Sequence, residues 1–117
     1  MRILALGGTV GFAVLLVLLW TFFAPGRSET CRQGLVWRDA APNDHVCVTP
    51  RTRAQTAADN AAAGSRINPD GGPFGKLTCL QGFVWREAFN GDTVCVAPAT
   101  RAQAAADNAE AANRRAP

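Results

Sequence analysis

Four cysteines carry the chemistry that is easiest to assign in this sequence. Cys31, Cys47, Cys79 and Cys95 repeat one spacing twice, and none of them belongs to a CxxC pair. Zinc sites usually take their ligands from close CxxC-like pairs, and thiol-disulfide redox proteins use the CxxC spacing itself. An even number of cysteines at a repeated spacing in a small exported domain is instead typical of structural disulfides. We therefore predict disulfides, with a four-cysteine zinc site as the alternative.

Two tryptophans, Trp37 and Trp85, stand at equivalent places in the two halves of the sequence. A large ring beside a disulfide is an efficient way for a very small domain to exclude water, so we expect both rings in the core. The alternative is a pair of exposed rings that stack on sugars. In that case the polar partners would be the Asp–Asn pairs Asp59 with Asn60 and Asp107 with Asn108.

Arginines are repeated in the same way, with Arg38 and Arg86 directly after the tryptophans and Arg53 and Arg101 further along. Repeated arginines and aspartates favour ion pairs and hydrogen bonds that fix one element to another. A repeated polar ligand site is the alternative, because a duplication retains fold-holding residues as readily as binding residues.

Catalytic constellations are not evident. The only histidine, His45, is replaced by Thr93 in the second half, and no phosphate-cradling loop or convincing carboxylate pair occurs. The formal net charge of +3 is too mild for a nucleic-acid-binding surface. We therefore expect no enzyme, no cofactor, no metal and no nucleic-acid partner.

A duplication explains these repeated positions. Residues 31–66 and 79–114 align at a constant offset of 48 with 23 identities in 36 positions. Such a repeat is one supersecondary unit, too small to be stable alone. Four cysteines allow three connectivities, and a unit that arose alone would have closed its own bridge. We therefore predict the pairs Cys31–Cys47 and Cys79–Cys95, each contributing about 3 kcal/mol.

Each repeat has the pattern of a β-hairpin followed by a helix. The segments GLVWRDA and HVCVT flank the turn APND, and GFVWREA and TVCVA flank FNGD. A proline then opens an alanine-rich segment with helical spacing, with Thr49 as an N-cap in the first repeat. We expect the alanines to face the neighbouring unit, so that the two repeats pack together and cover Leu35, Trp37, Phe83 and Trp85.

The N-terminal segment has the length of a membrane span. Residues 3–24 carry no charge, and 22 residues of helix extend about 33 Å, close to the roughly 30 Å of a bilayer core. Gly7 and Gly11 form a GxxxG pair that favours close packing of a second membrane helix. A cleaved secretory signal is the alternative. We predict an anchor contacting membrane lipid through residues 3–24.

The expected architecture is an α+β fold with an N-terminal transmembrane helix and two disulfide-stapled hairpin–helix repeats. The expected boundaries are 1–25 for the anchor, 26–66 for the first repeat, 67–78 for a linker and 79–117 for the second repeat.

The repeats, with their VWRDA or VWREA and VCV segments, resemble tandem repeats of uncharacterised exported bacterial proteins. The resemblance covers residues 31–66 and 79–114, and it implies a bacterial, exported setting without implying an activity. We expect a single-pass bacterial membrane protein whose C-terminal part is periplasmic or extracellular. We expect that part to be a non-catalytic interaction module, an accessory or structural subunit that binds other proteins in a larger membrane complex. A cell-envelope carbohydrate-binding module is the alternative.

Overall fold

The computed structural model of the chain describes residues 29–117. The predicted anchor, with Gly7 and Gly11, lies outside the described residues. Within residues 29–117, no helix combines the length and the apolar character needed to cross a membrane.

Each repeat contains a short antiparallel hairpin, an α-helix and a terminal 3₁₀ turn, which confirms the predicted α+β repeats. The first repeat comprises β1 (Val36–Trp37), β2 (Cys47–Val48), α2 (Pro50–Ala62) and η1 (Ala63–Arg66). The second comprises β3 (Val84–Trp85), β4 (Cys95–Val96), α3 (Pro98–Glu110) and η3 (Ala112–Arg114). In both hairpins the tryptophan lies opposite the second cysteine of the repeat.

The helices begin where the prolines predict. The Thr49 side chain accepts a hydrogen bond of 3.1 Å from the backbone N–H of Thr52, and Pro50 occupies the first turn. Proline is favoured there because its missing N–H would have no partner within the helix. The second helix keeps the proline, but Ala97 makes no side-chain cap.

Both predicted disulfides are present. Cys31 bonds to Cys47 and Cys79 to Cys95, and no described cysteine is free. Each bridge ties the segment before the hairpin to its second strand. The bridge therefore holds together a sheet of only two residues per strand, which is far too short to be stable alone.

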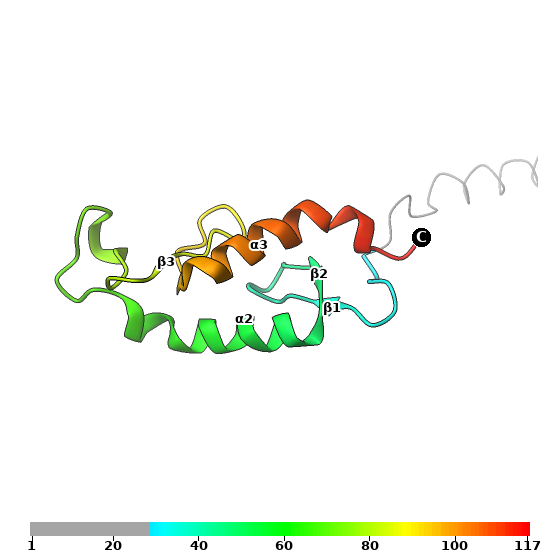
Figure 1. Cartoon of the computed structure of the whole chain (residues 1–117), viewed down its shortest axis with the longest axis horizontal. Helices are drawn as coiled ribbons and strands as arrows, with labels where there is room; N and C mark the ends of the chain where they lie inside the picture. Colours follow the sequence, from blue (N-terminus) through cyan, green and yellow to red (C-terminus); the bar gives the residue numbers. More distant parts are fainter. Residues whose placement is uncertain (1–28) are drawn as a thin grey trace, which may run out of the picture.

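The two repeats pack as a pair with approximate two-fold symmetry. Ile67, at the end of the first repeat, bridges to Cys79 at the start of the second, and Arg115 bridges to Cys31 in the same way. Helices α2 and α3 run in opposite directions on two sides of the molecule (Figure 1). The structure thus agrees with the expected paired packing of the repeats, since each one is completed by the other.

The predicted linker, residues 67–78, forms a hydrogen-bonded loop that includes η2 (Gly75–Leu77). The backbone N–H of Asn68 donates to the carbonyl of Thr78, and the N–H of Phe74 donates to the Thr78 hydroxyl. This loop lies at the end of the molecule opposite the C-terminus (Figure 1).

The expected packing of the alanines was wrong. The alanines at helical spacing, Ala54, Ala57, Ala58, Ala61, Ala102, Ala105, Ala106 and Ala109, are exposed. The buried helix positions are instead Thr56 and Asp59 in α2, and Ala104 and Asp107 in α3. The inward face carries the polar contacts of Asp59 and Asp107 and, in α3, the packing of Ala104 with Ala40 and Ala88.

The expected burial of the tryptophans was also wrong for Trp37 and was met only in part by Trp85. Trp37 is 39% exposed and Trp85 is half-buried. The buried apolar side chains are all small: Ala40, Cys47, Val48, Ala88, Cys95, Val96 and Ala104. Strands of two residues place too little apolar surface between the repeats to enclose an indole ring.

Candidate functional site

Buried ion pairs occupy the centre of the molecule. Arg38 donates through Nε to Asp44 at 2.7 Å and through Nη2 at 3.1 Å, which makes a two-pronged pair across the first hairpin turn. Arg86 and Asp92 form the same pair in the second repeat at the same distances. Arginine suits this position because its planar guanidinium group matches both carboxylate oxygens.

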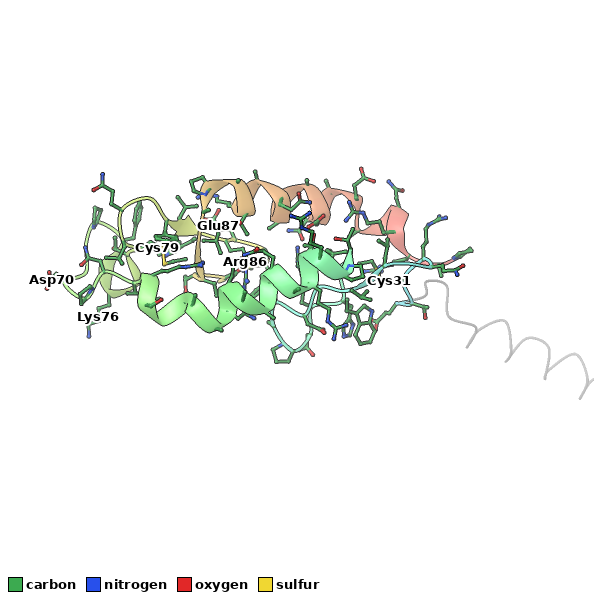
Figure 2. The ribbon with its side chains drawn as sticks, turned by 60° about the horizontal axis from the view of Figure 1, so that its bottom comes forward. Cys31, Asp70, Lys76, Cys79, Arg86 and Glu87 are labelled. Carbon is green, nitrogen blue, oxygen red and sulfur yellow. A yellow bond between two sulfur atoms is a disulfide. The ribbon has the colours of Figure 1, made fainter. Side chains whose placement is uncertain are left out.

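The two central arginines also connect the repeats. Arg38 Nη1 donates to the side-chain oxygen of Asn108 at 2.9 Å, and Arg86 Nη1 donates to Asn60 at 2.9 Å. Each asparagine side chain also donates to the hairpin of its own repeat. The side-chain amide of Asn108, for example, donates to the carbonyl of Ala88 at 2.8 Å. Arg86 lies between the two ends of the molecule in Figure 2. The network therefore joins each hairpin to the other repeat's helix.

The repeated aspartates of the helices are also structural. Asp59 accepts from Arg66 at 2.9 Å, and Arg66 also donates to the carbonyl of Cys95 in the other repeat. Asp107 and Arg114 form the corresponding pair at 2.8 Å. The second carboxylate oxygen of each aspartate, Oδ2, is closed off from solvent and has no hydrogen-bond partner among the described residues.

The structure therefore assigns the predicted polar residues to two groups. Arg38, Arg86 and the two Asp–Asn pairs hold the repeats together, whereas Arg53 and Arg101 form ion pairs at the surface. Asp44 and Asp92, which accept hydrogen bonds from Arg38 and Arg86 respectively, were not among the residues predicted from the sequence. Their signal was the repetition of an aspartate at the end of both hairpin turns, six residues after the arginine.

Asp44 gives the network a measurable pH dependence. Burial alone would raise the pKa of its carboxyl group. Hydrogen bonds and the charge of Arg38, with the N–H groups of Ala40 and Val46, nevertheless lower the pKa below its ordinary value of 3.8. As the pH falls, Asp44 is therefore protonated more readily in the unfolded chain than in the folded protein. The stabilisation that Asp44 provides is complete above its ordinary pKa of 3.8. It is lost as the pH falls through the lower pKa that Asp44 has in the folded protein.

We expect the free energy of unfolding to decrease in this acid range, with the Asp44 carboxyl group titrating below 3.8 in the folded protein. Denaturant unfolding at a series of pH values, combined with NMR of the ¹³C-labelled carboxyl groups, measures both. Asp70→Asn, which removes a carboxyl group at an exposed loop position away from Arg38, is the control variant. Titration of Asp44 at or above 3.8 would contradict the role assigned to Arg38.

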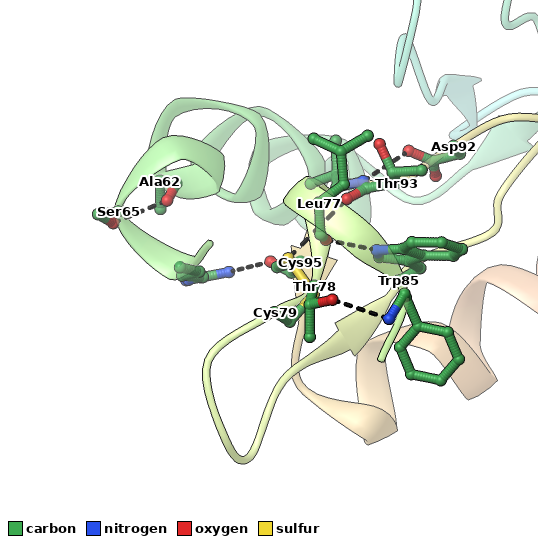
Figure 3. Close-up of a disulfide and its surroundings, with 12 residues drawn as sticks. Ala62, Ser65, Leu77, Thr78, Cys79, Trp85, Asp92, Thr93 and Cys95 are labelled. Atoms are coloured by element: carbon green, nitrogen blue, oxygen red, sulfur yellow. Dashed lines mark hydrogen bonds between the residues drawn. A yellow bond between two sulfur atoms is a disulfide. The ribbon is translucent and has the colours of Figure 1, made fainter. Parts of the chain in front are cut away.

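A cleft of about 340 Å³ lies on the outer side of the second hairpin. Its apolar walls are Phe74, Phe83, Val84 and Trp85, with the Cys79 end of the disulfide. The Trp85 ring nitrogen donates to the carbonyl of Leu77 at 2.8 Å, which fixes the ring beside the loop (Figure 3). We call this site the second-repeat cleft.

The polar rim of the second-repeat cleft is an ion pair. Arg101 Nη2 lies 2.9 Å from a carboxylate oxygen of Glu87, and both side chains are about half exposed. Glu87 has a φ of 53°, a left-handed conformation that is uncommon for residues other than glycine. Such strained positions cluster at functional sites.

The first repeat contains the corresponding cleft, of about 360 Å³. Trp37, Val36 and Leu35 line it, with an ion pair of 3.4 Å between Asp39 and Arg53. Asp39 has the same left-handed φ, 54°. The molecule thus presents the same kind of cleft twice, each with a tryptophan wall and an acid–arginine rim.

The two clefts differ in what contacts the tryptophan. His45 stacks on Trp37 with ring centroids 3.9 Å apart. In the second repeat threonine replaces the histidine. There the ring centroids of Phe74 and Trp85 are 5.6 Å apart, and the two ring planes are inclined by 54°. The loop between the repeats therefore adds an aromatic wall to the second-repeat cleft.

Within residues 29–117, no group of three or more His, Cys, Asp or Glu side chains is arranged to hold a metal ion. Comparison of the chain with protein-family models, curated proteins and solved structures finds no match. Function must therefore be inferred from the residues of this chain alone.

Proposed function

We propose that this chain is a membrane-anchored, non-catalytic interaction module that binds other proteins as an accessory or structural subunit of a membrane complex. The proposal rests on the observation that the repeated residues have two different roles, one inside the molecule and one at its surface. The central arginines, aspartates and asparagines are engaged in joining the repeats. The two clefts with a tryptophan wall are open to solvent, and such apolar clefts suit binding better than catalysis.

The cellular setting follows from two features. Two disulfides within 89 described residues favour an oxidising compartment outside the cytoplasm. The charge-free residues 3–24 have the length of a membrane span. We accordingly place the chain in a bacterial membrane with residues 29–117 on the periplasmic or extracellular side.

Carbohydrate binding is the second candidate, favoured by the exposure of Trp37. A ring at the surface can stack on a sugar, whereas a core ring cannot. However, the Asp–Asn pairs that would have bound the sugar hydroxyls are engaged between the repeats: Asp107 is buried against Arg114, and both polar ends of the Asn108 amide have protein partners. The sugar site thereby loses the polar groups on which its specificity would depend.

The proposal is tested by purifying the tagged full-length chain from its own membranes in a mild detergent. We expect a protein partner in stoichiometric amount that remains bound through a high-salt wash, because an apolar contact does not weaken with ionic strength as an exposed ion pair does. The chain should also resist extraction by carbonate. A chain that purifies alone, or that binds envelope polysaccharide without a protein, would contradict the proposal.

A further inference from the structure

We propose that the second-repeat cleft is the docking site for a large apolar side chain, aromatic or leucine-like, presented by a partner protein. This proposal deepens the proposed function and rests on it.

The position of the cleft favours a protein over a lipid surface. Phe74 belongs to the loop between the repeats, which lies at one end of the molecule, whereas the C-terminus lies at the other (Figure 1). Residue 29 is at that other end, because the backbone N–H of Ala116 donates to the carbonyl of its neighbour Thr30. Figure 2 likewise shows Cys31 and Asp70 at opposite ends. An anchor preceding residue 29 therefore leaves the second-repeat cleft at the end away from the bilayer.

The polar groups of the cleft favour an apolar occupant. Glu87 and Arg101 neutralise each other at 2.9 Å. The Thr78 hydroxyl donates to the carbonyl of Gly75 and accepts from the N–H of Phe74, and the Trp85 ring nitrogen is bonded to Leu77. The Thr78 hydroxyl and the Trp85 ring nitrogen are therefore already engaged, and an apolar side chain leaves these bonds intact.

The walls of the second-repeat cleft include exposed apolar surface that a partner would cover. Phe74 is 71% exposed although it contacts Trp85, and Leu77 and Leu80 beside it are also exposed. Covering such rings is the main favourable contribution at protein interfaces, where binding energy concentrates in a few aromatic contacts. An inserted side chain would lie against the solvent-facing sides of Phe74 and Trp85, which both line the cleft.

The aromatic wall is specific to the second repeat. The sequence has Gly26 at the position 48 residues before Phe74, so the duplication does not supply a second phenylalanine there. The two clefts are therefore not interchangeable, and the first-repeat cleft serves as an internal comparison.

The test is an NMR titration of the ¹⁵N-labelled full-length chain in lipid nanodiscs. The probes are N-acetyl-tryptophan amide and N-acetyl-leucine amide, with an N-acetylglucosamine oligosaccharide as the carbohydrate arm. We expect saturable shifts from the two amides at Phe74, Phe83 and Trp85, and none from the oligosaccharide. Phe74→Ser should weaken amide binding about tenfold, equivalent to roughly 1.4 kcal/mol. Phe89→Ser is the matched control, because Phe89 is an exposed ring of the same repeat outside this cleft.

Several results would overturn the inference: shifts in the cleft with the oligosaccharide alone, equal shifts in the two clefts, or an unchanged affinity in Phe74→Ser. A lipid occupant would appear as cleft shifts on transfer from detergent to nanodiscs without any probe, and this result would also overturn it. If a protein partner co-purifies equally with Phe74→Ser and the unsubstituted chain, the docking site is wrong while the proposed function stands. If the amides bind the cleft but no protein co-purifies, the proposed function fails, and with it the docking of a partner protein.

Discussion

Replacing Arg86 with alanine should lower the free energy of unfolding by about 3–5 kcal/mol, which is the cost of leaving a buried charge without its partner. The Arg86 and Asp92 side chains are 2% and 1% exposed, so water cannot replace the guanidinium group. A small domain has a total stability of about 5–15 kcal/mol. The variant should therefore lose a large share of the protein's stability.

The same variant should loosen both repeats. Arg86 bonds to Asn60 of the first repeat as well as to Asp92 of its own. We expect hydrogen exchange to lose protection in residues 31–66 as well as in residues 79–114. The control is Arg101→Ala, which removes a half-exposed ion pair and should cost at most about 1 kcal/mol. Loss of protection in the second repeat alone would contradict the inter-repeat role of Arg86.

Removing the Cys79–Cys95 disulfide by a double replacement with alanine should cost about 3 kcal/mol, within the 2–5 kcal/mol typical of small secreted domains. The bridge closes a loop with a sequence separation of 16 residues, so its loss frees the unfolded chain from that constraint. The hairpin it closes has only two paired residues per strand. The bridge therefore contributes a large share of the second repeat's stability.

Double replacement of Cys31 and Cys47 is the matched control, because that loop has the same sequence separation. We expect a loss of similar size, measured by denaturant unfolding with both variants at the same protein concentration. Because each repeat completes the other, the variant lacking both bridges should not fold. A cost below about 1 kcal/mol for either bridge would show that the contacts between the repeats suffice without it.

Local structure was largely predictable from the sequence. The turn residues, the alternating apolar segments and the proline at each helix start are local signals, and they correctly located both hairpins and both helices. The duplication added the disulfide pairing, because a repeated unit closes its own bridge. Each of these features depends on residues close together in the chain.

What the sequence could not show was which face each helix would bury. Ala57 and Thr56 are neighbours in the chain, yet only Thr56 turns inward. The choice depends on Arg38, Asn108 and Asn60, which meet only when the two repeats come together. Helical periodicity identifies a helix, but alanine does not specify a direction because its burial contributes little either way.

The second-repeat cleft was only partly foreseeable. Trp85 was evident as a repeated residue, but Phe74 lies in a segment with the composition of a linker. Its contact with Trp85 depends on the folding of the loop around Thr78. The structural contrast between the two clefts therefore depends in part on a residue outside the duplication.

The central claim, that the chain binds a protein partner through the second-repeat cleft, is tested most directly by quantitative co-purification from membranes. The unsubstituted chain, Phe74→Ser and Phe89→Ser are compared at equal expression. We expect the ratio of co-purified partner to chain to fall about tenfold in Phe74→Ser and to stay unchanged in Phe89→Ser. Equal ratios in all three, or a loss confined to Phe89→Ser, would contradict it.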